Sequence, residues 1–286
     1  MDRGNHWRDD KFDFFLSSLR AYPSGNTCFL TRFSYILATL AGKTVLVVGG
    51  SSGIGYGVAK ASLLSRASKV ITASSSKAKE EAALVRLKDD TTVAGSTVEG
   101  TASGEVVDAR DSKNVKELLE RVGEIDHLVW TSGDSLRTSF PDMDLDAQKD
   151  VFDVRFWGPF TAAQVAKIRP GGSITLTTGT ILVRPMKGSS LMSGVVGAVD
   201  SLARGLAVDL APIRVNVISP GLVKTELLGQ LPAEAFKKFE QYANTVLVQH
   251  MGQPDELAEA YLFCMKCQYI TGQRIEVDGG GKFIYS

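Results

Sequence analysis

The chain has 286 residues, which is enough to bury one substantial hydrophobic core. Lys and Arg together number 32, as do Asp and Glu, so the chain has no formal net charge and we expect no nucleic-acid partner. Since no run of eighteen apolar residues occurs, the sequence also predicts no membrane-spanning helix and no membrane partner.

The first forty residues show no regular apolar pattern. Their acidic residues argue against a transit peptide, and no apolar segment typical of a signal peptide follows a basic start. We interpret residues 1–40 as a variable N-terminal extension and residues 41–286 as the folded domain. Three cysteines are too few for a disulfide framework and favour the reducing cytoplasm. Cys264 and Cys267 have C-x-x-C spacing but no companion pair or His cluster, so we interpret them as helix thiols and predict no metal site.

Short β-branched runs alternate with helical patterns from residue 43 onward. We expect strands within 44–48, 70–73, 106–107, 127–130, 174–177 and 214–218, and helices at about 56–66, 113–123, 145–168, 190–210 and 255–266. Strands that alternate with helices need crossover connections, which produce a parallel sheet with both faces covered. The sequence therefore predicts an α/β fold, a Rossmann-type doubly wound parallel sheet in a single domain.

A glycine-rich turn links the first strand to the first helix. Glycine lets the backbone turn sharply and approach a diphosphate, and the free N–H groups at the start of the helix face the anion. A purely structural turn is the alternative, but the strand–turn–helix context favours a phosphate site. The predicted dinucleotide contacts in this turn are Gly49, Ser51, Ser52, Gly53, Ile54 and Gly55.

The end of the second strand distinguishes NAD from NADP. A carboxylate there would bind the ribose 2′-OH and repel a 2′-phosphate. This chain instead has Ser74, Ser75 and Ser76, followed by Lys77 and Lys79. Hydroxyl and ammonium groups suit a phosphate, so we predict NADP(H); a polar turn with solvated lysines is the alternative.

The spacing G-x-x-x-G-x-G, together with later segments in the same order, resembles the short-chain dehydrogenase/reductase family over residues 40–282. Residues 130–133 (Trp-Thr-Ser-Gly) stand where that family has Asn-Asn-Ala-Gly, residues 220–225 match its Pro-Gly-x-x-x-Thr segment, and residues 271–280 match its C-terminal strand. The resemblance implies that Asp108 contacts the adenine. It adds the following cofactor contacts: Ser132, Gly133, Pro220, Gly221, Val223 and Thr225.

The same resemblance implies a catalytic Ser, Tyr, Lys and Asn, and all four are replaced here. The corresponding positions are Gly179, Met192, Val196 and Arg155. Met cannot donate a proton, and Val cannot tune a phenol. General acid catalysis is typically worth about 10²–10⁴-fold, so we expect a poor ketone reductase.

Three hypotheses remain open at this point. The first is reduction of an imine or iminium ion, because hydride addition to C=N⁺ yields a neutral amine without a protein acid. The second is a redox-neutral cyclase or isomerase that uses the cofactor as part of the pocket wall. The third is a catalytically inactive module that binds NADP(H), which Met192 and Val196 would favour if they filled the pocket.

A narrower resemblance ranks the first hypothesis highest. The segments at residues 49–59, 132–136, 154–156, 173–179 and 183–185 are similar to a group of fungal short-chain reductases that includes the bifunctional reductase/Diels–Alderases of bridged diazaoctane indole alkaloid (malbrancheamide and paraherquamide) biosynthesis. That resemblance implies reduction of a cationic prenylated-indole cyclic dipeptide with NADP(H), followed by a guided cycloaddition. The group has an acidic residue after its Arg-Pro segment, where this chain has Met186 and Lys187.

Arg155 and Asp134 are the predicted catalytic residues. Arg155 would anchor the substrate or stabilise charge; the alternative is an ion pair with Asp134, Asp153 or another neighbour. Asp134 would face a cationic substrate or cap a following helix. Thr178 and Thr180 are further candidate hydrogen-bond donors. We interpret Trp157 as core, with a place in the pocket as the alternative, and we interpret His127 and His250 as structural rather than catalytic.

Residues 226–253 carry apolar and aromatic side chains at helical spacing, namely Leu227, Leu228, Phe236, Phe239 and Tyr242. The family resemblance makes this stretch a lid, which would suit a bulky apolar substrate, although helix packing would need the same residues. In relatives the helices that correspond to 145–168 and 190–210 form the dimer face, so a homodimer or homotetramer is expected.

Overall fold

The computed structural model describes residues 39–93, 96–134, 137–229 and 233–284. Residues 1–38, almost all of the predicted extension, lie outside this description, as does Cys28. Leu40 is fully buried, and its N–H donates to the carbonyl of Ser65 at 2.7 Å. The packed domain therefore includes residue 40.

Seven parallel strands form the central sheet, in the order β5-β2-β1-β6-β7-β8-β9. Their bounds are β1 Thr44–Val48, β2 Lys69–Ser74, β5 Thr101–Val106, β6 Glu124–Trp130, β7 Lys167–Thr177, β8 Arg214–Pro220 and β9 Arg274–Val277. A two-stranded hairpin pairs β3 (Thr92–Val93) with β4 (Ser96–Thr97). The doubly wound α/β fold predicted from the sequence is confirmed.

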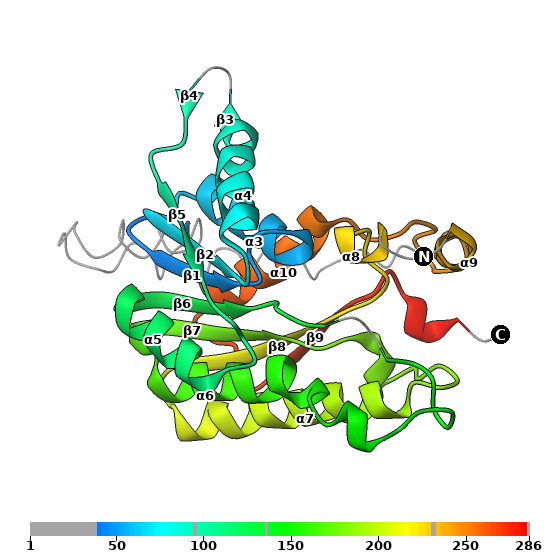
Figure 1. Cartoon of the computed structure of the whole chain (residues 1–286). Helices are drawn as coiled ribbons and strands as arrows, with labels where there is room; N and C mark the ends of the chain where they lie inside the picture. The colour runs from blue at the N-terminus through cyan, green and yellow to red at the C-terminus, as the bar shows by residue number, and fades with distance from the viewer. Residues whose placement is uncertain (1–38, 94–95, 135–136, 230–232, 285–286) are drawn as a thin grey trace, which may run out of the picture. The chain divides into compact units, whose positions relative to one another are not determined.

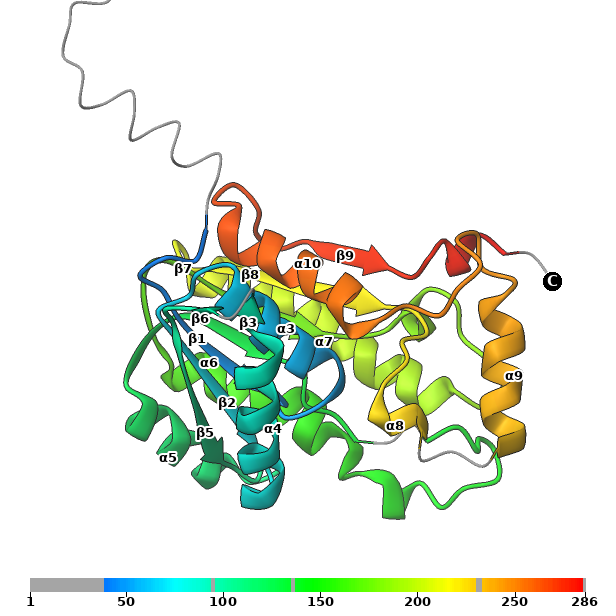
Figure 2. The same ribbon diagram turned by 90° about the horizontal axis from the view of Figure 1, so that it is seen from above.

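Helices cover both faces of the sheet, as Figures 1 and 2 show. One layer contains α3 (Gly53–Leu64), α4 (Lys77–Asp90) and α10 (Pro254–Lys266); the other contains α5 (Ser112–Val122), α6 (Gly158–Val165) and α7 (Ser190–Asp209). Each layer packs its own apolar cluster against the sheet. Figures 1 and 2 show the short α8 (Glu226–Gly229) and α9 (Ala233–Ala243) beyond the carboxyl ends of the strands.

Two elements were missed or shortened in the sequence interpretation because they are polar. Helix α4 buries only Glu80, Ala83 and Leu87, so its apolar stripe is too weak to recognise from periodicity. Strand β5 reads Thr-Ala-Ser-Gly-Glu-Val and lies at the edge of the sheet, where half-exposed residues are tolerated.

The helix predicted at 145–168 is wrong as a single element. The chain forms a 3₁₀ turn at Asp146–Gln148, a π-helix at Asp153–Trp157 and then α6, and residue 167 already begins β7. The π-helix has an identifiable cause. The Val154 carbonyl accepts the indole N–H of Trp130 at 3.0 Å, the Gly158 N–H reaches back to the carbonyl of Asp153, and Pro159 has no N–H to donate.

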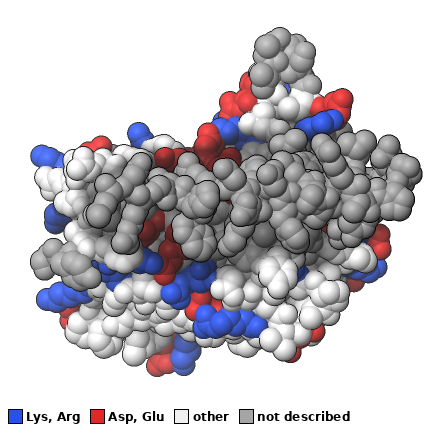
Figure 3. All heavy atoms as spheres, turned by 180° about the vertical axis from the view of Figure 1, so that it is seen from behind, with Lys and Arg blue, Asp and Glu red and all other residues white. Residues whose placement is uncertain are grey.

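Helix α7 is, by length and apolar composition alone, able to cross a membrane. In the structure it packs on β8 and buries seven side chains, among them Met192 and Val196, so it serves as a core helix. On the surface that Figure 3 shows, Lys and Arg side chains are interspersed with Asp and Glu.

Candidate functional site

The strand order reverses between β1 and β6, which is where doubly wound sheets bind ligands beyond their carboxyl ends. Gly49 follows β1 with a φ of +91°, and a Cβ at this residue would lie 2.6 Å from the backbone nitrogen of Ser132, just past β6. The N–H groups of Thr131 and Ser132 both donate to the carbonyl of Val48, at 2.8 and 3.1 Å. The predicted glycine turn and the segment after β6 therefore meet at the switch point.

Gly53 and Gly55 let the start of α3 approach this turn. A Cβ at Gly55 would lie 2.2 Å from the Gly49 carbonyl oxygen and 2.4 Å from the Oγ1 of Thr131. Gly53 has a φ of +53°. The N-cap Ser52 makes no side-chain hydrogen bond to the helix, and Ile54 packs against the core. The turn thus has the closely packed glycines and the helix start that doubly wound folds place at a dinucleotide diphosphate.

The three serines after β2 are in different environments. The Ser74 hydroxyl is buried and has no hydrogen-bond partner among the described residues, so it is available to a ligand. Ser75 is exposed. The Ser76 hydroxyl accepts the N–H of Lys79 at 3.4 Å and caps α4, which leaves it less free for a phosphate. Lys77 is exposed and lies 3.8 Å from Glu81.

Asp108 lies just beyond β5 and is linked to Asp134 through one arginine. Its Oδ1 accepts the backbone N–H of Arg110 at 3.0 Å, and the guanidinium of Arg110 donates to Oδ1 of Asp134 at 2.5 Å. Oδ2 of Asp134 is buried and has no partner among the described residues. The next described helical residues are those of the 3₁₀ turn beginning at Asp146, so no described helix is capped by Asp134.

The predicted nicotinamide segment follows β8. The N–H of Gly221 donates to the Val277 carbonyl at 2.9 Å, and a Cβ there would meet the Asp278 backbone at 2.7 Å. Val223 is buried, whereas Thr225 places its Cγ2 against Gly53. The carbonyl of Pro220 is 3.9 Å from where a Cβ of Gly179 would lie. These positions complete one edge that joins the ends of β1, β6, β7 and β8.

Arg155 is at the centre of the π-helix and points toward this edge. Its guanidinium donates to the backbone carbonyl of Asp134 and lies so close to Gly133 that a Cβ there would be 2.6 Å from its Nη1. Its Nε is buried without a partner among the described residues. Burial lowers the pKa of Arg155, and the carboxylate of Asp134 opposes that shift. The structure thus brings the two predicted catalytic residues together, with Gly133 providing the space.

The side chains that replace the family's Ser, Tyr and Lys carry no ionisable or hydroxyl group, since these positions hold Gly179, Met192 and Val196. Met192 is fully buried with Val151 and Val195, and Val196 is buried as well. The Thr178 hydroxyl donates to the Ile218 carbonyl at 3.3 Å and is therefore already occupied within the fold. Thr180 is half-buried in the following 3₁₀ turn.

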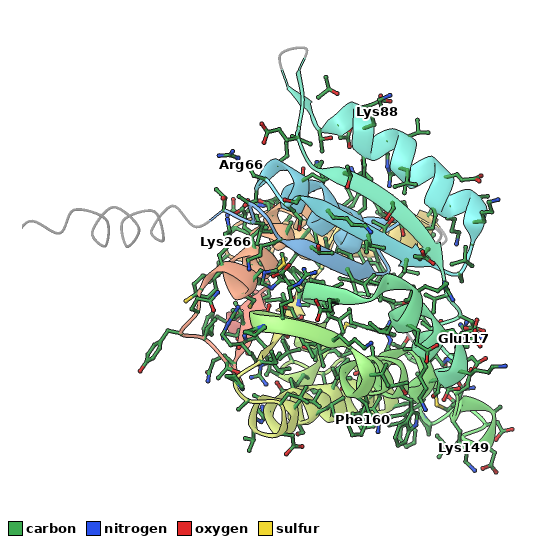
Figure 4. The ribbon with its side chains drawn as sticks, turned by 90° about the vertical axis from the view of Figure 1, so that its left-hand side faces the viewer. Arg66, Lys88, Glu117, Lys149, Phe160 and Lys266 are labelled. Atoms are coloured by element: carbon green, nitrogen blue, oxygen red, sulfur yellow. The ribbon has the colours of Figure 1, made fainter. Side chains whose placement is uncertain are left out.

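Trp157, His127 and His250 lie in different environments. Trp157 is 51% exposed, so its interpretation as core is wrong; it packs against Phe156 and Phe160 on the outer side of the helix layer. Figure 4 labels Phe160 in this position. His127 is structural, since it is buried against the Ser173 hydroxyl at 2.9 Å and burial lowers its pKa to about 4. His250 is exposed and pairs with Glu256.

The thiol interpretation is also consistent with the structure. Both thiols are free; Cys264 is buried in α10, and burial raises its pKa to about 12, while Cys267 ends the helix. Within the described ranges, no cluster of three or more His, Cys, Asp or Glu is arranged to hold a metal ion.

The sequence interpretation missed one pair of residues at the glycine turn. Oε2 of Glu226, the first residue of α8, accepts the Gly53 N–H at 2.8 Å, and Arg86 of α4 contacts both Glu226 and the Ser51 carbonyl. No local pattern signals a contact between residues so far apart along the chain.

Comparison with known proteins identifies one family over almost the whole of the described chain. The sequence model described as "SDR-like rossmann domain" matches residues 36–284. The short-chain dehydrogenase/reductase fsr5 of Gibberella fujikuroi is 34% identical over 254 residues, covering 85% of this chain and 96% of that protein. The short-chain dehydrogenase/reductase malC of Malbranchea aurantiaca is 32% identical over 251 residues, covering 84% and 95%.

Solved structures of the same family have a similar fold. The MalC reductase/Diels-Alderase from Malbranchea aurantiaca superposes with a TM-score of 0.79 at 32% identity, covering 88% of this chain and 100% of that one. A small-chain dehydrogenase in complex with NADPH gives a TM-score of 0.68 at 30% identity, with coverages of 84% and 99%.

Proposed function

Because the chain belongs to the short-chain dehydrogenase/reductase family but has no proton donor at that family's acid positions, we propose that it is an NADPH-dependent reductase of a cyclic imine or iminium ion in fungal secondary metabolism. The chain is an enzyme of the oxidoreductase class that its relatives represent. The burial of Met192 in an apolar cluster is the observation that carries the proposal. A reaction that needs no acid from the protein suits such a site.

The cofactor would lie along the carboxyl edge of the sheet. Gly49, Gly53 and Gly55 let the turn and the start of α3 pack closely, so that the diphosphate could approach the backbone there. The Ser74 hydroxyl, which has no partner among the described residues, would bind near the adenosine ribose. The absence of a carboxylate at the end of β2 supports NADPH rather than NADH, as does the NADPH present in a solved relative. When bound, the reduced nicotinamide supplies a hydride.

Arg155 and Asp134 would bind the substrate. Among the described residues, Nε of Arg155 is a donor without a partner and Oδ2 of Asp134 is an acceptor without one, so together they complement a group that offers both, such as an amide. The carboxylate of Asp134 also offers a negative charge to a cationic substrate, although its ion pair with Arg110 partly neutralises that charge. Hydride addition to C=N⁺ removes that positive charge and leaves a neutral amine.

Consumption of NADPH with matched substrates tests this proposal. A panel of ketones, neutral cyclic imines and N-alkylated cyclic iminium ions, including prenylated-indole compounds, is incubated with the wild-type chain and with Gly55→Ala. We expect oxidation of NADPH with the N-alkylated iminium ions and with those cyclic imines that water has protonated at the assay pH, none with the ketones, and none with the variant. Reduction of ketones at a similar rate would contradict the proposal. Binding of NADPH without any oxidation would also contradict it.

A cyclisation is the second candidate, and the similarity to a protein described as a reductase/Diels-Alderase favours it. The same pocket would hold the reduced product while it closes. Enantiomeric excess of the cyclised product distinguishes the two: a selective product formed with NADP⁺ from an already reduced substrate supports catalysis of ring closure, and a racemic product contradicts it.

We also propose that the chain forms a homodimer or homotetramer through α6 and α7. Trp157 and Phe160 are exposed side by side with near-parallel rings, and Val208 of α7 is 77% exposed. Light scattering after size exclusion gives the mass. We expect an oligomer for the wild-type chain and a monomer for Trp157→Asp; a monomeric wild type would contradict the proposal.

A further inference from the structure

The carboxylate of Glu226, which lies 173 positions later in the chain than Gly53, binds the start of α3. Glu226 comes directly after Thr225 in the nicotinamide segment, and its Oε2 accepts the N–H of Gly53, the first residue of α3, at 2.8 Å. An N-cap side chain accepts the N–H of the second or third helical residue, and Ser52 makes no such bond, so its side chain does not satisfy this helix end. Glu226 therefore supplies the anion that this helix end favours.

Arg86 holds the other oxygen of this carboxylate. Its Nη1 lies 3.4 Å from Oε1 of Glu226, and its Nη2 donates to the Ser51 carbonyl at 3.1 Å. The guanidinium is 3.7 Å from the centroid of the Tyr56 ring, and the Tyr56 hydroxyl donates to Asp90. The arginine is thus positioned over the glycine turn by contacts that do not involve Glu226.

A carboxylate and a dinucleotide phosphate would compete for the same groups. The Gly53 N–H has a single proton, and it belongs to the helix start that the diphosphate is proposed to approach. Two anions at this position would also repel one another. The side chains of Glu226 and Arg86 are 52% and 44% exposed, and such exposed pairs contribute little stability, so the contact can be exchanged readily.

We propose that Glu226 is an internal competitor for the cofactor phosphates, and that Arg86, once released, becomes one of their ligands. The proposal rests on the dinucleotide binding proposed above and concerns its regulation. It predicts opposite signs for two substitutions: loss of the Glu226 charge strengthens binding, whereas loss of the Arg86 charge weakens it. If the pair only supported the structure of the turn, both losses would weaken binding.

The test is an equilibrium titration of NADPH, followed by the change in its fluorescence, at low and high salt. We expect Glu226→Gln and Glu226→Ala to lower the Kd by about three- to tenfold, and Arg86→Gln to raise it by a similar factor. Both effects should shrink as salt increases. Glu120→Gln on α5 and Lys88→Gln on α4 are matched controls, because both residues are exposed on helices and neither contacts the turn; Figure 4 labels Lys88.

The outcomes separate this proposal from the one on which it rests. If the wild-type chain binds NADPH and both Glu226 variants bind it equally or more weakly, the competitor role is overturned and the cofactor assignment stands. If neither the wild-type chain nor the Glu226 variants bind a dinucleotide, both proposals fall. Tighter binding by Glu226→Gln and Glu226→Ala, with weaker binding by Arg86→Gln, supports both.

Discussion

Replacing Gly133 with alanine is expected to displace the guanidinium of Arg155. The new Cβ would lie 2.6 Å from Nη1, 2.7 Å from Cζ and 2.9 Å from Nη2, all below an ordinary van der Waals contact. A guanidinium is the far end of a flexible side chain and can move, so the methyl group itself costs little. The cost is the hydrogen bond from Arg155 to the Asp134 carbonyl. Hydrogen bonds from charged groups contribute about 1.5–3 kcal/mol, and we expect the free energy of unfolding to fall by that amount.

A double-mutant cycle isolates this contact. Urea unfolding is measured for the wild-type chain, Gly133→Ala, Arg155→Ala and the double variant. Once Arg155 is truncated, the alanine has nothing to displace, so its added cost should be close to zero and the coupling energy about 1.5–3 kcal/mol. The rate of NADPH oxidation with an iminium substrate should show the same non-additivity. Effects that add within about 0.5 kcal/mol would refute the placement of Arg155 against Gly133.

Three further substitutions have defined outcomes. Gly55→Ala directs its Cβ at the Gly49 carbonyl, 2.2 Å away, and backbone cannot swing aside, so titration should show no NADPH binding; retained affinity would contradict the proposed cradle. The pKa of His127 is lowered to about 4 in the folded chain, so above pH 6.5 its imidazole is neutral in both the folded and the unfolded chain. As the pH falls to about 4, the unfolded chain binds a proton at His127 that the folded chain does not, which lowers the free energy of unfolding by about 3 kcal/mol. His127→Asn should therefore flatten the pH dependence of urea unfolding over that range, and an unchanged pH dependence would contradict this assignment. Arg214 is buried and donates to the carbonyls of Cys264 and Met265 in the last turn of α10. Arg214→Met should lower the free energy of unfolding, measured in urea, by about 2–4 kcal/mol. A change below about 0.5 kcal/mol, which is typical of a surface substitution, would contradict this capping role.

Much of the fold could be predicted because its signals are local. The strand, glycine turn and helix at residues 44–64 are contiguous, and each has the residue types that its geometry requires. The helices around Val115, Val199 and Tyr261 are amphipathic or apolar enough to recognise from spacing alone. The order of these elements then leaves few alternatives to a parallel sheet.

Apart from α4 and β5, whose polar sequences give weak local signals, the errors occurred where distant residues decide the local structure. The apolar run near Val154 looks helical, but the indole of Trp130 takes a carbonyl that a continuous α-helix would use. Pro159 was the one local signal that could have warned of this interruption. The contact between Glu226 and Gly53 spans 173 positions, and no periodicity can reveal a hydrogen bond of that kind.

The π-helix also sets the direction in which the side chains after it point. A π-turn holds one residue more than an α-turn, so every side chain after it is rotated by about 100° from where a regular helix would direct it. Removing a single residue from Asp153–Trp157 would keep nearly all of the local chemistry but aim it elsewhere. Along this segment the number of residues, as much as their kind, determines what faces the ligand.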